Sequence, residues 1–297
     1  MQTFTPSAVA VLDWYDGGLV HAHAGQRQAY QPLFTTFPRL VGRSPKNLVR
    51  ELSERLGVTH FYLADLDALQ GRRETGATDL ALEILGDGLT LWWDRGLGCT
   101  LGSGSDHPQR FSFSGAQCHP VLGTESCRSP ADLFALLASV GVRPWTLSLD
   151  LIRRNGGWCW FGHEDRSDQT DRTDRSDQTD RTDQTDRSDQ TDRTDQNERS
   201  WGAMPFAEVV ELSVQLGVRQ LIVLNLADVG SNETSTGPIL RELRRDFPTV
   251  SLIAGGGVRD NAAFRRIVDH GADYVLTGTW LWTQLSEALP WHAAPRS

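Results

Sequence analysis

Residues 250–260 read VSLIAGGGVRD, an apolar run that stops at three successive glycines and restarts at Asp260. The run predicts a buried strand, and Asp260 predicts the N-cap of a following helix. Glycines at such a strand end leave backbone N–H groups bare, and these groups point into one concavity that suits phosphate. A tight strand–helix turn without a ligand is the structural alternative.

A second strand end of this kind follows closely. Residues 272–279 read ADYVLTGT, a buried run that ends at a glycine and a threonine before a further helix. Two helix N-termini would then direct their positive dipole ends at one anion. We therefore predict a phosphate site formed by Gly255, Gly256, Gly257, Gly278 and Thr279.

Six more apolar runs precede this pair, beginning near residues 8, 60, 90, 117, 145 and 220. Amphipathic stretches separate most of them, and five runs end in a carboxylate or an amide. These end residues are Asp13, Asp65, Asp94, Asp150 and Asn225. Eight strand–helix units with short connections predict parallel pairing and closure into a (β/α)8 TIM barrel, a single domain with its site at the C-terminal ends of the strands.

Two connections are unusual. Residues 19–44 are polar and aperiodic, contain His21, His23, Arg27 and Tyr30, and are long enough to suggest a functional loop. Surface positions are an equal alternative for the histidines. A loop with Gly156 and Gly157 is expected after the fifth strand. The basic run 241–245 is interpreted as the solvated face of a helix.

Composition excludes several classes of protein. The 297 residues carry a net charge of −9, which argues against a nucleic-acid-binding surface. Four cysteines lack CxxC spacing, so reduced cytosolic thiols are expected. No apolar run approaches the length of a membrane span and no signal peptide is evident, so we expect a cytoplasmic protein without membrane contact, and a monomer.

An acidic low-complexity segment interrupts the pattern after the fifth strand. Within residues 165–197 Asp recurs at every third position, and the segment contains eleven Asp and six Arg. Nothing in the segment is apolar enough to be buried, so we predict a disordered insert on the rim of the site. Weak cation binding is a less favoured alternative, because the segment lacks the glycines of a calcium loop.

The chain repeats its own motifs. Residues 10–13 with Gly17 resemble residues 147–150 with Gly157, and residues 121–124 resemble 275–279. Two half-barrels, about 8–141 and 145–289, would explain the repetition. They would place Asp13 and Asp150 on opposite sides of the barrel mouth, and give the first half its own phosphate turn at Gly123 and Thr124.

These motifs make the chain similar to the phosphoribosylformimino-aminoimidazole carboxamide ribotide isomerase family of histidine biosynthesis, over nearly all its length except the insert. The family performs an Amadori rearrangement of an aminoaldose phosphate without metal or cofactor. The resemblance implies that Asp150 is the acid that opens the ribose ring and that Asp13 is the base that removes the C2′ proton. It also implies substrate contacts at Asp65, Asn225 and Arg27. Such a pair requires one protonated and one ionised carboxyl group.

The chain departs from the family at two strand ends, as a divergent paralogue would. Leu224-Asn225 stands where the family has a threonine and an acidic residue, and Trp93-Asp94-Arg95 replaces a glycine-rich turn. A carboxylate in a phosphate turn repels phosphate unless Arg95 compensates. Three functions stay open: an isomerase of a phosphorylated ribose compound, a related enzyme of tetrahydromethanopterin- or methanofuran-linked one-carbon metabolism, and a non-catalytic barrel that binds a phosphate ligand.

Overall fold

Eight parallel strands close into a barrel in the computed structural model, which describes residues 8–23, 26, 29–72, 76–97, 117–139, 145–154, 157–161, 200–231 and 233–290. The barrel strands are β1 (Ala8–Tyr15), β4 (His60–Asp65), β5 (Thr90–Asp94), β6 (Cys118–Gly123), β7 (Thr146–Arg154), β9 (Gln220–Asn225), β10 (Ser251–Gly255) and β11 (Tyr274–Thr277). Parallel pairing of β11 with β1 closes the ring and aligns Val9 with Leu276. The predicted α/β barrel is confirmed.

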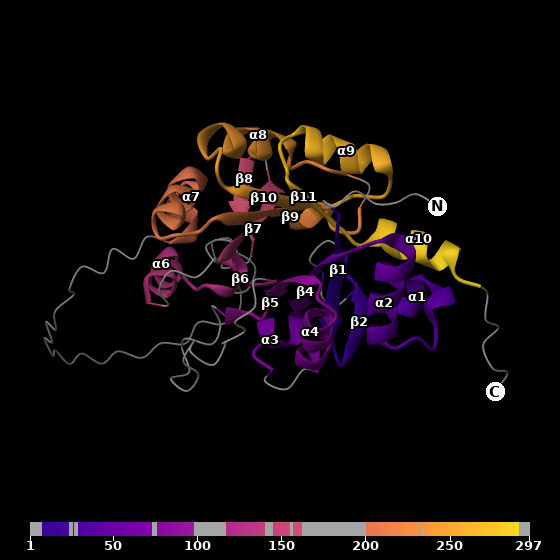
Figure 1. Cartoon of the computed structure of the whole chain (residues 1–297). Helices are drawn as coiled ribbons and strands as arrows, with labels where there is room; N and C mark the ends of the chain where they lie inside the picture. Colours follow the sequence, from indigo (N-terminus) through magenta and orange to yellow (C-terminus); the bar gives the residue numbers. More distant parts are fainter. Residues whose placement is uncertain are drawn as a thin grey trace, which may run out of the picture.

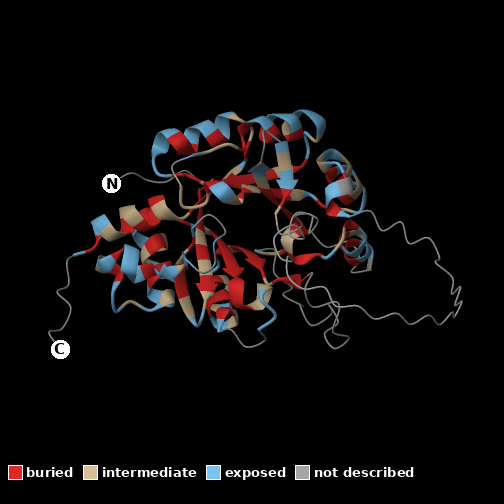
Figure 2. Cartoon of the chain, turned by 180° about the vertical axis from the view of Figure 1, so that it is seen from behind, coloured by how far each residue is buried: buried red, intermediate tan, exposed pale blue. Residues whose placement is uncertain are grey.

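Helices surround the ring of strands (Figure 1). The longer ones are α2 (Pro45–Leu56), α4 (Ala77–Gly86), α6 (Pro130–Ser139), α7 (Phe206–Gln215), α8 (Gly237–Asp246), α9 (Asn261–Asp269) and α10 (Thr279–Ala288). Each buries one face against the strands and exposes the other (Figure 2), as amphipathic sequences require. Asp260 caps α9 as predicted, because its side chain accepts the N–H of Ala263 at 2.7 Å. Among the described residues no helix is long and apolar enough to span a membrane.

Side chains of alternate strand residues fill the barrel interior, because neighbouring residues of a strand point to opposite faces. At the N-terminal end of the strands His60, Trp92, His119 and Tyr274 form an aromatic layer, in which the Trp92 and His119 rings stack at 5.1 Å. Gln220 completes the layer: its Oε1 accepts Trp92 Nε1 at 3.0 Å. Above it, aliphatic residues including Val121, Ile222 and Ile253 form a buried cluster. The barrel is therefore closed at this end.

Two connections that the sequence suggested were loops contain strands instead. β2 (Gly18–His21) turns back antiparallel to β1, and Asp13 pairs with Val20. β3 (Gln31–Pro32) and the short helix α1 (Leu33–Thr36) follow it. β8 (Gly157–Trp160) turns back on β7 in the same way. These hairpins depend on pairing with the long ends of β1 and β7, which local sequence does not reveal.

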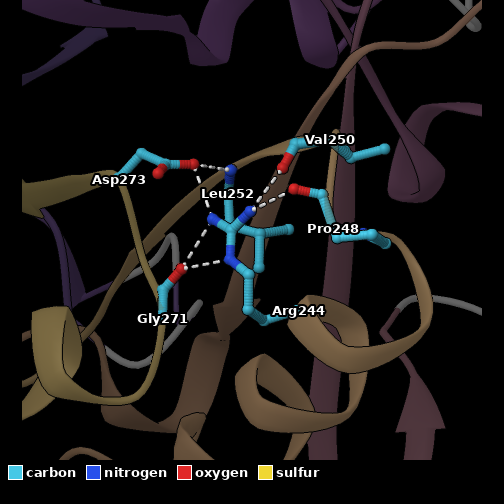
Figure 3. Close-up of polar contacts among 6 residues, drawn as sticks. All are labelled: Arg244, Pro248, Val250, Leu252, Gly271 and Asp273. Atoms are coloured by element: carbon cyan, nitrogen blue, oxygen red, sulfur yellow. Dashed lines mark hydrogen bonds and ion pairs between the residues drawn. The ribbon is translucent and has the colours of Figure 1, made fainter.

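Arg244 corrects the interpretation of 241–245 as a solvated face. Its guanidinium lies among the loops that connect α8 to β10 and α9 to β11 (Figure 3), and it donates to the carbonyl oxygens of Pro248, Val250 and Gly271 at 2.7–3.2 Å. It also pairs with Asp273 at 2.7 Å. The neighbouring Arg245 is exposed, as a solvated helix face requires, and it pairs with exposed Asp246. Arg244 therefore ties together the last two strand–helix units.

Several predictions about the chain stay untested. Arg27 and the insert 165–197 lie outside the described residues. The half-barrel repeat stays a prediction, although both β1 and β7 are followed by an antiparallel hairpin strand.

Candidate active site at the barrel mouth

One pocket opens at the C-terminal ends of the strands and brings together most of the predicted site. Its lining includes both predicted catalytic residues, Asp13 and Asp150. Four residues of the predicted phosphate site line it too: Gly256, Gly257, Gly278 and Thr279. Strands from both halves of the chain therefore face one cavity, as expected for this fold.

Asp13 lies on β1 beside Ala64 of β4 and faces this pocket. In the part of the chain that the structure describes, no hydrogen bond reaches its carboxylate. Burial raises the pKa of Asp13 from 3.8 to about 7, because the surrounding protein replaces the water that would stabilise the ionised form. Near neutral pH its carboxyl group is consequently poised between the protonated and the ionised form.

Asp150 lies on β7 in a different environment, although it faces the same pocket. Its Oδ1 accepts the hydroxyl of Ser148 at 2.9 Å, and its Oδ2 accepts the Thr124 hydroxyl at 3.4 Å and the N–H of Glu125 at 3.3 Å. Three donors favour the ionised form of a carboxyl group. The environments of Asp13 and Asp150 thus differ in the way that acid–base chemistry needs.

Asp94 and Tyr62 lie on the same side of the barrel as Asp150 and add a further carboxylate and a hydroxyl group there. The Tyr62 hydroxyl donates to Asp94 Oδ2 at 3.4 Å, and the N–H of Gly96 donates to Asp94 Oδ1 at 3.0 Å. Burial raises the pKa of Tyr62 well above its ordinary value, and the negative charges of Asp94, Asp150, Glu125 and Asp13 add to the shift in that order. Tyr62 lines the pocket as a protonated hydrogen-bond donor.

Arg95, the residue after Asp94, packs against an aromatic ring. Its guanidinium stacks on Trp93 at 4.4 Å. Burial lowers the pKa of Arg95, and the negative charge of Asp65 partly opposes this shift. Asp65 itself caps the short helix α3 (Leu66–Leu69) by accepting the N–H of Ala68 at 3.0 Å. Asp94, which stands where the family has a glycine-rich turn, is thus a buried carboxylate beside Tyr62.

The predicted phosphate turn of the first half lies behind Asp150. Thr124 is buried and its hydroxyl accepts the Asp150 N–H at 3.0 Å while donating to Asp150 Oδ2. A Cβ on Gly123 would lie 3.2 Å from Asp150 Oδ2 and 3.4 Å from Asp94 Oδ2. Glu125, the next residue of the turn, lines the pocket.

The turn of the second half is open to the pocket and has a basic group beside it. Gly256 and Gly257 adopt positive φ angles of 96° and 67°. α10 begins at Thr279 without a side-chain cap, and the Thr279 hydroxyl lies 2.9 Å from His21 Nε2. Burial lowers the pKa of His21, and the positive charges of Arg259 and His23 lower it further. One basic side chain, His21, thus lies at the N-terminus of α10, while the Arg259 guanidinium donates to the carbonyl oxygens of Gly230 and Ser231.

Asn225 lies at the end of β9 but contacts the following loop rather than the pocket. Its Nδ2 donates to Asp228 Oδ1 at 2.9 Å and to the Ser235 hydroxyl at 2.7 Å. Asp228 Oδ2 in turn accepts from the N–H and the hydroxyl of Ser235. The amide therefore holds the loop that carries Gly230 and Ser231 onto the pocket wall.

The sequence missed the roles of His21, Tyr62 and Glu125 in lining the pocket. His21 belongs to a hairpin that was expected to be a loop. Tyr62 lies three residues before the end of β4, and strand alternation could have placed it inside the barrel once the strand was assigned. Among the described residues no group of three His, Cys, Asp or Glu side chains is arranged to hold a metal ion.

Comparison with known proteins assigns this chain to no family. No model of a known protein family matches the chain, and no curated protein resembles it in sequence at a significant level.

Proposed function

We propose that the protein is an acid–base isomerase that converts a phosphorylated aldose, or an aminoaldose of Amadori type, into the corresponding ketose. The observation that carries the proposal is the pair Asp13 and Asp150, which face one pocket in contrasting environments. The resemblance of the strand-end motifs to the ribotide isomerase family supports the same reaction class. Histidine biosynthesis is the narrow form of the proposal.

The resemblance implies Asp150 as the acid and Asp13 as the base, but the surroundings of the two carboxyl groups favour the opposite assignment. Asp13, half-buried and with a pKa of about 7, suits the acid that protonates the ring oxygen and opens the sugar. Asp150, whose carboxylate accepts hydrogen bonds from Ser148, Thr124 and the Glu125 N–H, suits the base that removes the C2 proton. Opening of an aldose ring also releases the proton of its anomeric hydroxyl. The proton taken from C2 is then replaced by one at C1, and a proton passes from O2 to O1, so that the aldose and the ketose contain the same number of protons and no cofactor is needed.

Tyr62 supports this chemistry as a neutral donor. A hydroxyl whose pKa is raised by burial and by nearby carboxylates stays protonated throughout the working pH range. It can donate to the oxygen that becomes negative in an enediol-like intermediate, a form of stabilisation that active sites use widely. The phosphate of the substrate would bind across the pocket, at Gly256, Gly257 and Thr279.

The proposal is tested by proton exchange rather than by product identity alone. Candidate aldose phosphates, including ribose 5-phosphate and phosphoribosylated amines, are incubated with the protein in D2O, and deuterium at C1 or C2 is followed by NMR. The variants Asp13→Asn and Asp150→Asn are each expected to lose about 10²- to 10⁴-fold in exchange rate. The variant Asp16→Asn removes the same charge from an exposed carboxylate near Asp13 and serves as the matched control.

Complementation of a histidine auxotroph tests the narrow form. Growth that depends on both aspartates would support histidine biosynthesis. Failure to complement, combined with aspartate-dependent exchange, would point to another phosphorylated sugar. Binding of a sugar phosphate without exchange by the wild-type protein would contradict the isomerase proposal and favour a non-catalytic barrel.

A further inference from the structure

The N-terminal end of the barrel is closed by stacked rings that include two histidines. His60 of β4 and His119 of β6 stack on Trp92 of the intervening strand β5, with ring centroids 5.8 and 5.1 Å from that of Trp92. Gln220 of β9 accepts both the Trp92 N–H and the Thr146 hydroxyl, at 3.0 and 2.8 Å. Side chains of neighbouring strands therefore meet at the end of the barrel opposite the pocket.

The His119 ring has a nitrogen that suits only the neutral form. Its Nδ1 atom is buried, and among the described residues it has no hydrogen-bond partner. A neutral imidazole can carry its proton on Nε2 and leave Nδ1 as a bare acceptor. An imidazolium carries a proton on both nitrogens, so protonation of His119 would create a buried donor without an acceptor.

Two effects of the surroundings on the charge of His119 oppose each other. An imidazolium stacked on an indole ring is attracted to its π electrons. Burial removes the water that would stabilise the same charge; it lowers the pKa of His119 and of His60, and the charge of His60 lowers the pKa of His119 further. Burial and the missing partner of Nδ1 act together against one stacking contact, so the neutral ring is favoured.

No described residue supplies a counter-charge to the His119 ring. Tyr274 of β11 contributes a further aromatic ring, 5.2 Å from that of Trp92. The Asp273 carboxylate next to it is paired with an arginine of α8. Cys118 packs on the outer face of the strands, and burial raises the pKa of its thiol to about 11. Uncharged polar groups complete the layer: Thr59, whose hydroxyl oxygen lies 2.9 Å from His60 Nδ1, Thr146 and Gln220.

The strand that carries His119 is weakly held at its start. The first three residues of β6 are half-buried, whereas β4 and β5 each begin with only one such residue. β6 pairs with β7 only from Val121 onwards, so Cys118, His119 and Pro120 pair with β5 alone. Pro120 also lacks the N–H that another residue could donate to a neighbouring strand. The stack on Trp92 is therefore a main contact that holds this segment in the barrel.

We propose that His60, Trp92 and His119 form an acid-sensitive latch, in which protonation of His119 releases the start of β6 from β5 and opens the N-terminal end of the barrel. The C-terminal ends of the strands and the pocket stay folded in this opened form. Below about pH 6.5 a released histidine binds a proton more readily than the packed ring, so the latch is stable above this pH and weakens as the pH falls. The inference is independent of the proposed function.

Hydrogen exchange of the full-length protein, followed by mass spectrometry at about pH 7.5 and 5.5, tests the latch. The exchange rates are corrected for the intrinsic effect of pH on amide exchange. Protection of residues 118–121 should then fall by about tenfold at the lower pH, because one proton taken up on release changes the opening equilibrium about tenfold for each pH unit below 6.5. Protection of β10 should stay unchanged.

Substitutions separate the latch from general sensitivity to acid. His119→Phe keeps a stacked ring that cannot be protonated, so residues 118–121 should be equally protected at both pH values. His119→Gln, which cannot be protonated either, provides the same comparison with a smaller side chain. His23→Asn removes an exposed histidine and should keep the pH dependence of the wild type. Equal protection at both pH values in the wild type, a wild-type pH dependence in folded His119→Phe or His119→Gln, or an equal loss of protection in β10 would each overturn the proposal.

Discussion

His21 Nε2 lies 2.9 Å from the hydroxyl oxygen of Thr279, a contact that joins the first hairpin of the chain to the first residue of its last helix. The contact closes the seam where β11 meets β1, beside the predicted phosphate site. It also places a titratable ring next to the open N-terminus of α10, close to Arg259 and His23.

His21 is expected to make anion binding depend on pH. Burial and the charges of Arg259 and His23 lower its pKa, so the ring of the free protein is mainly neutral at pH 7. A bound dianion favours the charged ring, so sulfate should bind more tightly as the pH falls from about 8 to 6, and His21→Asn should weaken binding at pH 6 by about tenfold. Sulfate is the probe because its own charge is constant in this range.

Asp13 also loses charge on acidification, in the wild type and in His21→Asn alike, so the difference between the two proteins isolates the histidine. His270→Asn, at the far end of α9, is the control. An equal pH dependence in wild type and His21→Asn would show that the ring takes up no proton.

Asp13→Asn is expected to stabilise the protein at alkaline pH. The pKa of Asp13 is about 7 in the folded state against 3.8 ordinarily, so the folded state binds more protons between these values and its stability falls as the pH rises through them. The substitution should raise the free energy of unfolding by about 2 kcal/mol at pH 8 and by little at pH 4. Urea unfolding at both pH values measures this difference, and a gain of equal size at both would argue against ionisation as its cause.

Gly257→Ala is expected to destabilise the fold by more than about 3 kcal/mol, because a Cβ there would collide with the carbonyl oxygen of Glu233 and because φ is 67°. Gly42→Ala is the control: its φ is 77°, but nothing lies within 4 Å of its Cβ position, so only the backbone cost of about 1 kcal/mol applies. Chemical unfolding of the two variants separates steric collision from backbone strain. Equal losses of stability in the two variants would mean that the loop containing Glu233 moves away from a Cβ at position 257 at little energetic cost.

Arg244→Met is expected to cost about 2–4 kcal/mol, since three carbonyl groups and Asp273 lose a shared donor. Arg245→Met, at the adjacent position, removes only a pair on the surface and should leave the urea midpoint unchanged. A similar loss of stability for both variants would mean that helix propensity or net charge causes the loss, rather than the hydrogen bonds of Arg244 drawn in Figure 3.

Periodicity and strand-end chemistry were sufficient to predict the barrel and the shared pocket of Asp13 and Asp150. Both signals are local, since an apolar run followed by a polar residue marks the C-terminal end of a strand. Contacts between distant segments were not predictable in this way. The groups bound by Arg244 come from residues up to 29 positions away, and the partner of His21 lies 258 positions further along the chain.

Thr124 illustrates the same limit within the site. Its motif predicts a phosphate ligand, and whether the hydroxyl meets an external anion or the Asp150 carboxylate depends on the packing of β6 against β7. The sequence could indicate a turn suited to an anion, but the identity of the anion required the neighbouring strand.

The aromatic layer of His60, Trp92, His119 and Tyr274 closes the N-terminal end of the barrel. Within the part of the chain that the structure describes, a molecule that enters the pocket from the C-terminal end of the strands must leave by the same end. One ligand must then leave before the next can bind, so the loops around the pocket entrance determine how fast a ligand exchanges with the solvent.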